Sequence, residues 1–171
     1  AASLANGRGA TIADSQRYAD LLSGQGREAE AAVVYAKALA QAGDDATWVH
    51  HLQLGGALER AGQWDNALPH LRKAVELAPE QPIALNYLGY AQIERGENLK
   101  EATALLERAG KLRPDDAAIV DSLGWAYFRS GDIDRALPLL EKAAQGEPGS
   151  ATINEHLGDA HWPIGRRFEA R

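Results

Sequence analysis

The stretch that decides the fold is "VDSLGWAYFRSGDIDRAL", Val120 to Leu137. It has the composition of a helix, yet it places Gly124 between Leu123 and Trp125, where a glycine costs roughly 0.5–1 kcal/mol relative to alanine. The helical period puts Gly124 and Trp125 about 100° apart around the axis, so the two residues face different neighbours. A glycine in that position predicts that another helix approaches closely on its side.

The Leu-Gly pair recurs along the chain at a nearly constant spacing. Its glycines are 34, 35 and 34 residues apart: Gly55, Gly89, Gly124 and Gly158. Each is followed by an alanine, by a second glycine (Gly62, Gly96, Gly131 and Gly165) and by a second alanine. Three of the units continue to a proline, at Pro79, Pro114 and Pro148. A period of this length indicates an array of repeated structural units.

Each unit is expected to form two helices. The first helix ends at the second glycine, which tolerates a left-handed stop, and the second helix ends before the proline. We expect the first glycine of a unit to let the two helices approach at the second alanine, in the pairs Gly55–Ala67, Gly89–Ala102 and Gly124–Ala136. A single pair cannot bury its apolar face alone, so the pairs are expected to stack into a solenoid.

This pattern resembles the tetratricopeptide repeat (TPR). The agreement is best in "WVHHLQLGGALERAGQWDNALPHLRKAVELAP", Trp48 to Pro79, and in Ala117 to Pro148. The resemblance implies an all-α fold, a right-handed α-solenoid of antiparallel helix pairs known as the TPR superhelix. Gln92 departs from the family pattern, because the family prefers an aromatic residue at that position.

The repeat sets the expected domain organisation. Residues 1–13 are predicted to be a flexible N-terminal extension, followed by a TPR array over 14–171. The array divides into a degenerate unit (14–45), three full units (48–81, 82–116 and 117–150) and an incomplete unit (151–171). Pro163 is expected to stop or kink the first helix of the last unit. Because the chain begins with Ala1 rather than methionine, we expect it to be a piece of a longer protein.

The amino-acid composition argues against several classes of function. The net charge is −6 and no basic stripe is present, which argues against a nucleic-acid partner. No apolar run approaches the roughly 20 residues of a membrane span. The chain has no cysteine, which removes disulfides and thiolate metal sites.

Two motifs of possible chemical meaning are set aside, and no cofactor or metal is expected. "GQGREA", Gly24 to Ala29, fits a dinucleotide-binding pattern, but helical segments flank it where a strand would be needed. His156 and Asp159 share a helix face, whereas His161 lies about 140° away from the first histidine. No nucleophile-base arrangement is apparent, so the chain is predicted not to be an enzyme.

The resemblance implies that the first helices line a concave groove where extended or helical peptides dock. Carried over by position, the candidate residues are Leu52, Asn86, Tyr90, Ile93, Asp121, Trp125, Phe128, Arg129, Glu155, Asp159 and Trp162. Carboxylates outnumber arginines here, which favours a protein or peptide partner with apolar anchors and a neutral to basic charge. The alternative interpretation is that the aromatic rings pack between neighbouring first helices and the acids are solvated surface.

The leading functional hypothesis is a non-catalytic scaffold or adaptor that binds a partner in the concave groove. One alternative is a regulatory or substrate-presenting arm of a larger enzyme, and another is a structural module that self-associates through its exposed ends. The last two units look like the C-terminal part of long TPR proteins of Gram-negative bacteria. That resemblance implies the periplasm or cell envelope, with the cytoplasm as the alternative.

Overall fold

The computed structural model describes the backbone of residues 11–169 and the side chains of residues 11–162, and all regular structure in this range is helical. Most of the predicted extension over 1–13 lies outside the described residues. The first helix begins at Ile12, where Thr11 and Asp14 form a capping box. By its internal contacts the chain divides into two units, Ala1–Pro79 and Glu80–Arg171.

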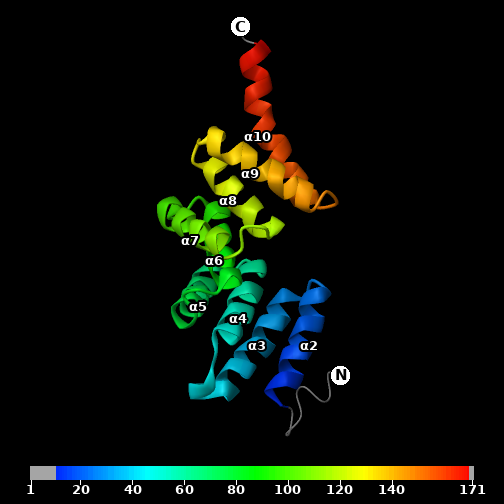
Figure 1. Ribbon diagram of the computed structural model, residues 1–171. Helices are drawn as coiled ribbons and strands as arrows, with labels where there is room; N and C mark the ends of the chain where they lie inside the picture. Colours follow the sequence, from blue (N-terminus) through cyan, green and yellow to red (C-terminus); the bar gives the residue numbers. More distant parts are fainter. Residues whose placement is uncertain (1–10, 170–171) are drawn as a thin grey trace. The chain divides into compact units, whose positions relative to one another are not determined.

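The described residues of the first unit form four α-helices and a short 3₁₀ turn, and Figure 1 shows how these elements follow one another. They are α2 (Ile12–Gly24), α3 (Glu28–Ala42), η1 (Gly43–Asp45), α4 (Trp48–Arg60) and α5 (Trp64–Leu77). Within this unit α2 packs against α3, α3 against α4, and α4 against α5. Two helix pairs, α2–α3 and α4–α5, therefore stack through the contact of α3 with α4.

The second unit continues the pattern with two full pairs and one long helix. Its elements are α6 (Pro82–Arg95), α7 (Leu99–Leu112), α8 (Ala117–Arg129), α9 (Ile133–Gly146) and α10 (Ala151–Glu169). Besides the contacts between consecutive helices, α8 touches both α6 and α10. The first helices of this unit thus form a layer with α8 in the middle.

The turns inside the pairs depend on glycine, as the repeat predicts. Gly62, Gly96 and Gly131 have φ values of 75°, 67° and 82°, which an L side chain rarely adopts. At the last of these turns the Asp132 N–H donates to the Tyr127 carbonyl at 2.9 Å, which closes the end of α8. The chain can therefore reverse within three residues and return along the first helix.

The close approach predicted at the Leu-Gly glycines is confirmed, but its main partner is a leucine. A Cβ added at Gly55 would lie 2.8 Å from Leu71, and one added at Gly89 would lie 2.7 Å from Leu106. Of the second alanines, Ala102 alone supplies one of the three nearest atoms, its carbonyl oxygen, which would be 3.0 Å from a Cβ on Gly89. The leucine one turn beyond the alanine fills the space because its longer side chain reaches across the pair.

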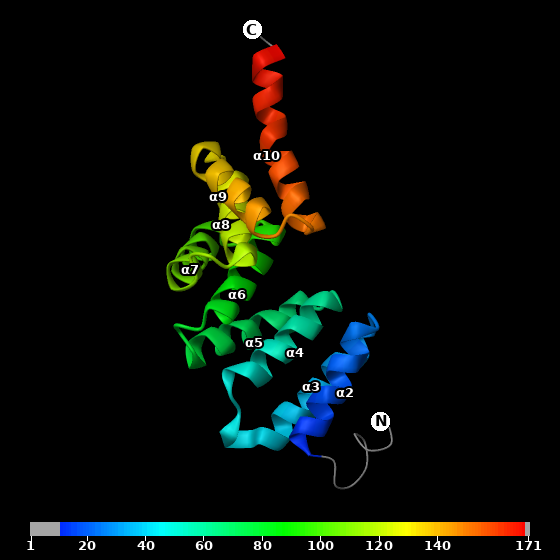
Figure 2. The same cartoon turned by 45° about the vertical axis from the view of Figure 1, so that its right-hand side comes forward.

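The expectation that Pro163 stops its helix is wrong, because α10 continues as one helix from Ala151 to Glu169 (Figure 2). A proline inside a helix removes one backbone hydrogen bond and strains the preceding turn. Both α5 and α9 also contain an internal proline, Pro69 and Pro138. Three described helices, α5, α9 and α10, therefore tolerate the loss of a backbone hydrogen bond at a proline. The described residues after Gly165 extend α10 and do not start a second helix.

Gln92, the departure from the family pattern, is fully buried in α6. Neither polar atom of its side-chain amide has a hydrogen-bond partner among the described residues. Burying an amide in this way costs about 1–3 kcal/mol. An aromatic residue at this position would avoid that cost.

Candidate partner-binding face

The first helices of the second unit present a mixed aromatic and acidic surface. We call the surface formed by Tyr90, Glu94, Phe128, Arg129 and Glu155 the first-helix face. Its residues come from α6, α8 and α10, which contact one another through α8. Asp159 follows Glu155 by four residues, which places it on the same side of α10.

Trp125 lies beneath this face and joins the three helices. Its indole ring stacks on His156 of α10, with centroids 4.1 Å apart and planes 10° from parallel. It also stacks on Phe128 at 5.0 Å, and its Nε1–H donates a 2.6 Å hydrogen bond to Glu94 Oε1 of α6. Only 8% of Trp125 is exposed. Its main contribution is therefore to packing between first helices, the alternative that the sequence leaves open.

Asp121 and His156 form a buried polar pair next to this stack. His156 Nδ1 lies 2.8 Å from Asp121 Oδ2, and both residues are buried. Asp121 Oδ1 has no hydrogen-bond partner among the described residues, and the same is true of the buried Asn86 Oδ1. These two oxygens, like Oε1 of Gln92, are buried acceptors on first helices that lack a donor within the described part of the chain.

Tyr90 is half-buried at the centre of the first-helix face. Its ring lies 6.2 Å from His156. Burial raises the pKa of the Tyr90 phenol to about 12, and the negative charges of Glu94, Asp121 and Glu155 add to the shift. The phenol is therefore neutral at physiological pH and able to donate a hydrogen bond.

Arg129 is held close to the aromatic stack. Its guanidinium lies 5.7 Å from the Trp125 ring and 3.6 Å from Glu94 Oε1. Glu94 Oε1 therefore accepts a hydrogen bond from the indole N–H and also lies close to the positive charge of Arg129. Glu155 and Asp159 are exposed on α10, so carboxylates dominate the accessible charge on this side.

The structure brings together six of the predicted site residues: Tyr90, Asp121, Trp125, Phe128, Arg129 and Glu155. Ile93, also predicted to line the groove, lies instead in the core with Leu106 and offers no surface to a partner. Leu52 is half-buried on α4 in the other unit. Trp162 is 65% exposed near the end of the described side chains of α10.

Sequence reasoning missed the packing role of His156. The residue stands two positions before Gly158, where the other units have Gln53, Tyr87 and Ser122. Residues of such mixed type at one position give no signal of a shared role. The only hint is that Asp121 stands three residues before Gly124, close to the repeat position that His156 occupies before Gly158.

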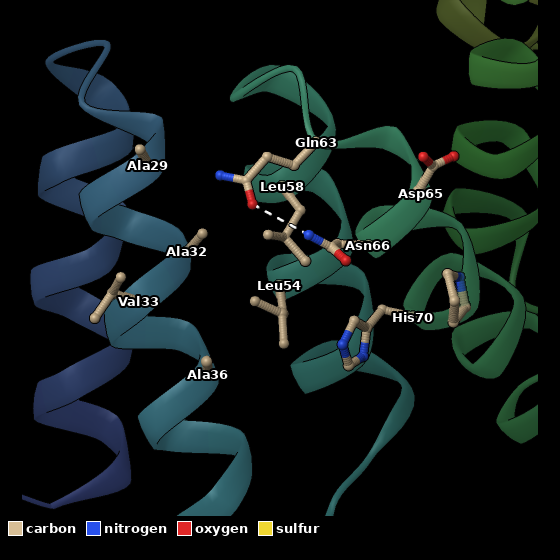
Figure 3. Close-up of a pocket in the computed structure, with 11 residues that line it drawn as sticks. Ala29, Ala32, Val33, Ala36, Leu54, Leu58, Gln63, Asp65, Asn66 and His70 are labelled. Carbon is tan, nitrogen blue, oxygen red and sulfur yellow. Dashed lines mark hydrogen bonds between the residues drawn. The ribbon is translucent and has the colours of Figure 1, made fainter.

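A hollow lies within the first unit (Figure 3). It is a hollow of about 490 Å³ between α3 and the α4–α5 pair. Ala32, Val33 and Ala36 line the α3 side, and Leu54 and His70 are among the residues opposite.

Comparison with known proteins agrees with this architecture. Tetratricopeptide repeat models match residues 58–124 and 122–170. The chain belongs to the tetratricopeptide repeat family. In sequence the TPR chain is 43% identical over 63 residues to the TPR repeat-containing protein PA4667 of Pseudomonas aeruginosa. It is 33% identical over 93 residues to the tetratricopeptide repeat-containing protein trd-1 of Caenorhabditis elegans.

The matches cover 37% and 54% of the TPR chain but only 11% and 12% of those two proteins. The chain therefore spans about a tenth of the length of these curated relatives. Among solved structures, the thermophilic TPR protein TTC0263 of Thermus thermophilus superposes with a TM-score of 0.77 at 22% identity, covering 94% of this chain and 86% of that one. Such a match shows the shared TPR solenoid fold.

The TPR fold is typically a non-catalytic scaffold for interactions between proteins. Within residues 11–169, no helix has both the length and the hydropathy that crossing a bilayer requires.

Proposed function

We propose that this TPR chain is a non-catalytic scaffold that binds a segment of a partner protein on the first-helix face. The observation that carries the proposal is the accessible surface of α6, α8 and α10, on which the half-buried rings of Tyr90 and Phe128 accompany the exposed carboxylates of Glu155 and Asp159. Aromatic side chains anchor many protein interfaces, and the exposed charges decide which partner is attracted.

The charge of the face supports a neutral or basic segment. Glu155 and Asp159 are exposed, whereas the guanidinium of Arg129 already lies near Glu94. An acidic segment would meet like charges here, which costs binding energy. Lysine or arginine in the partner would be attracted, and its apolar side chains would pack against Tyr90 and Phe128.

A charge-reversal experiment tests the electrostatic part of the proposal. A segment selected from a random peptide library on the full chain is expected to carry apolar and basic residues. The double variant Glu155→Lys with Asp159→Lys should bind this segment about tenfold or more weakly, measured by calorimetry. A matched control is Glu141→Lys with Glu147→Lys, because both residues are exposed and belong to α9 and its end.

The proposal also expects an aromatic contribution. Tyr90→Ala should cost about 2 kcal/mol of binding free energy if the ring is an anchor. Equal affinity of the wild type, Tyr90→Ala and the Glu155/Asp159 variant would rule out this face as the binding surface. Sedimentation of the free protein distinguishes partner binding from self-association, which would appear as a concentration-dependent increase in mass.

A further inference from the structure

Helix α3 of the first unit carries an exposed apolar strip along one side. Its residues are Ala29, Val33, Ala36 and Ala40, all of them exposed, and we call them the α3 strip. Val33 keeps 56% of its surface accessible. The spacing of four, three and four residues places the strip on one side of the helix. The buried residues of α3 belong to the core of this unit, so the strip is a surface that the core does not use.

The α3 strip suits the close approach of another helix. Three of its four residues are alanines, and the distance between two packed helices depends on the size of the side chains at the contact. Alternating steps of four and three residues also form the seam of paired helices. The strip borders the hollow of about 490 Å³, which Ala29, Val33 and Ala36 line from the α3 side (Figure 3). A helix on the strip would cover this edge of the hollow.

The charges along α3 indicate which helix fits. Their signs alternate from the N-terminal to the C-terminal end of the helix, at Arg27, Glu30, Lys37 and the pair Asp44 and Asp45. The Arg27 guanidinium donates two hydrogen bonds of 2.7 Å to Glu30. These hydrogen bonds lower the pKa of Glu30, so its carboxylate is ionised at neutral pH. The helix thus presents positive, negative, positive and negative charge in turn.

An antiparallel second copy of α3 would match these charges. Opposite ends of the helix would meet, which brings Arg27 of one copy close to Asp44 and Asp45 of the other. Near the middle, Lys37 of each copy would lie across from Glu30 of the other. A parallel copy would instead place every charge beside its equal.

We propose that two copies of this chain associate through their α3 strips, antiparallel and related by a two-fold axis, with Val33 of each copy beside Ala36 of the other. The contact is isologous, because each copy contributes the same surface. It closes after two copies and leaves no strip exposed.

This dimer should be weak and reversible. Four residues, three of them alanine, bury far less than the roughly 800 Å² per partner of a stable interface. The antiparallel helix dipoles and the exposed ion pairs add only modest stabilisation. The α3 strip belongs to the first unit, whereas Tyr90 and the rest of the first-helix face belong to the second. Self-association and partner binding can therefore be tested, and can fail, separately.

Sedimentation equilibrium of the full chain over a concentration series tests the association. We expect the average mass to rise toward twice that of one chain. Val33→Glu should weaken the dimer at least about tenfold, because it places a charge in the apolar contact. Leu112→Glu is the matched control, since it makes the same kind of change at an exposed apolar residue of α7 in the other unit. Circular dichroism checks that each variant remains helical.

A charge swap tests the antiparallel direction. Glu30→Lys and Lys37→Glu each set like charges against one another, so each alone should weaken the dimer several-fold. The double variant restores opposite charges across the contact and should recover most of the lost affinity. A double variant as weak as the two single variants would overturn the antiparallel arrangement.

A measurement on the unmodified protein keeps the proposal falsifiable if a variant does not fold. In a mixture of isotope-labelled and unlabelled chains, filtered NMR spectra should show contacts between the methyl groups of Val33 in one copy and Ala36 in the other. Contacts of Val33 with Val33 alone would indicate a parallel pair and overturn the proposal. A strict monomer over the whole concentration series, or a dimer that Val33→Glu leaves unchanged, would overturn it as well.

Discussion

Gly124 and Gly158 occupy the same position of the repeat but have different surroundings. A Cβ added at Gly124 would lie 2.9 Å from Leu140 Cγ and 3.1 Å from Leu139 Cβ. A Cβ added at Gly158 would meet no described atom within 4 Å. At Gly124 the missing side chain admits the neighbouring helix, whereas at Gly158 it only lowers helix propensity.

The two glycines should therefore respond to alanine with opposite signs. Gly124→Ala should lower the free energy of unfolding by about 1–3 kcal/mol, because the added carbon overlaps the packed leucines. Gly158→Ala should raise it by about 0.5–1 kcal/mol. Urea unfolding followed by circular dichroism measures both. Changes of the same sign would contradict the contacts described here.

Asp121 and His156 should behave as a coupled pair. His156→Ala leaves the buried carboxylate without its partner and removes the ring stacked on Trp125. We expect a loss of about 3 kcal/mol or more of unfolding free energy. In a double-mutant cycle with Asp121→Ala, the combined loss should fall short of the sum by at least about 1 kcal/mol. Strict additivity would show that the pair does not interact.

At the scale of the element, α9 begins on a charged cap. Asp132 Oδ1 accepts the Arg135 backbone N–H at 3.2 Å, and its Oδ2 lies 2.5 Å from Arg135 Nε. The hydrogen bond from the Arg135 side chain, aided by that from its backbone, lowers the pKa of Asp132. A carboxyl whose pKa is lower in the folded state stabilises the protein above its unfolded pKa. That stabilisation is lost as the pH falls through the folded pKa.

Asp132→Asn should remove this pH dependence. The variant keeps an oxygen acceptor for the cap but loses the charge facing Arg135. The wild type should be the more stable of the two at neutral pH, and its advantage should shrink below about pH 4. Urea midpoints measured between neutral and acidic pH test this. A constant difference between the proteins would mean that the charge contributes nothing to the cap.

The helices themselves could largely be predicted from the sequence, because glycine and proline act through the backbone alone. Gly62, Gly96 and Gly131 end first helices by adopting positive φ, and that requirement is visible without knowing any neighbour. The course of α10 could not be predicted in the same way. Pro163 ends the helix only if the lost hydrogen bond costs more free energy than the rest of the helix supplies. The residues next to Pro163 do not reveal that balance.

At the scale of the whole molecule, the candidate site could be predicted only in part. The helical period separates Trp125 from Gly124 by about 100° around α8, so the two residues face different neighbours. It does not tell whether a neighbouring helix covers Trp125, because that cover comes from His156 of a later unit. Burial therefore withdraws three predicted contact residues, Ile93, Asp121 and Trp125, from the surface.

The revised binding proposal consequently depends on the residues that remain accessible. They come from α6, α8 and α10, whereas α7 and α9 are second helices of their pairs. A partner segment that binds as proposed must therefore touch the first helices of the second unit and leave the second helices unaffected.

Mapping the amide NMR shifts of the isotope-labelled chain on addition of a library-selected segment tests this claim most directly. We expect the shifted amides to gather at Tyr90, Phe128, Arg129 and Glu155. Shifts that gather instead on α7 and α9, or on the hollow of the first unit, would contradict it.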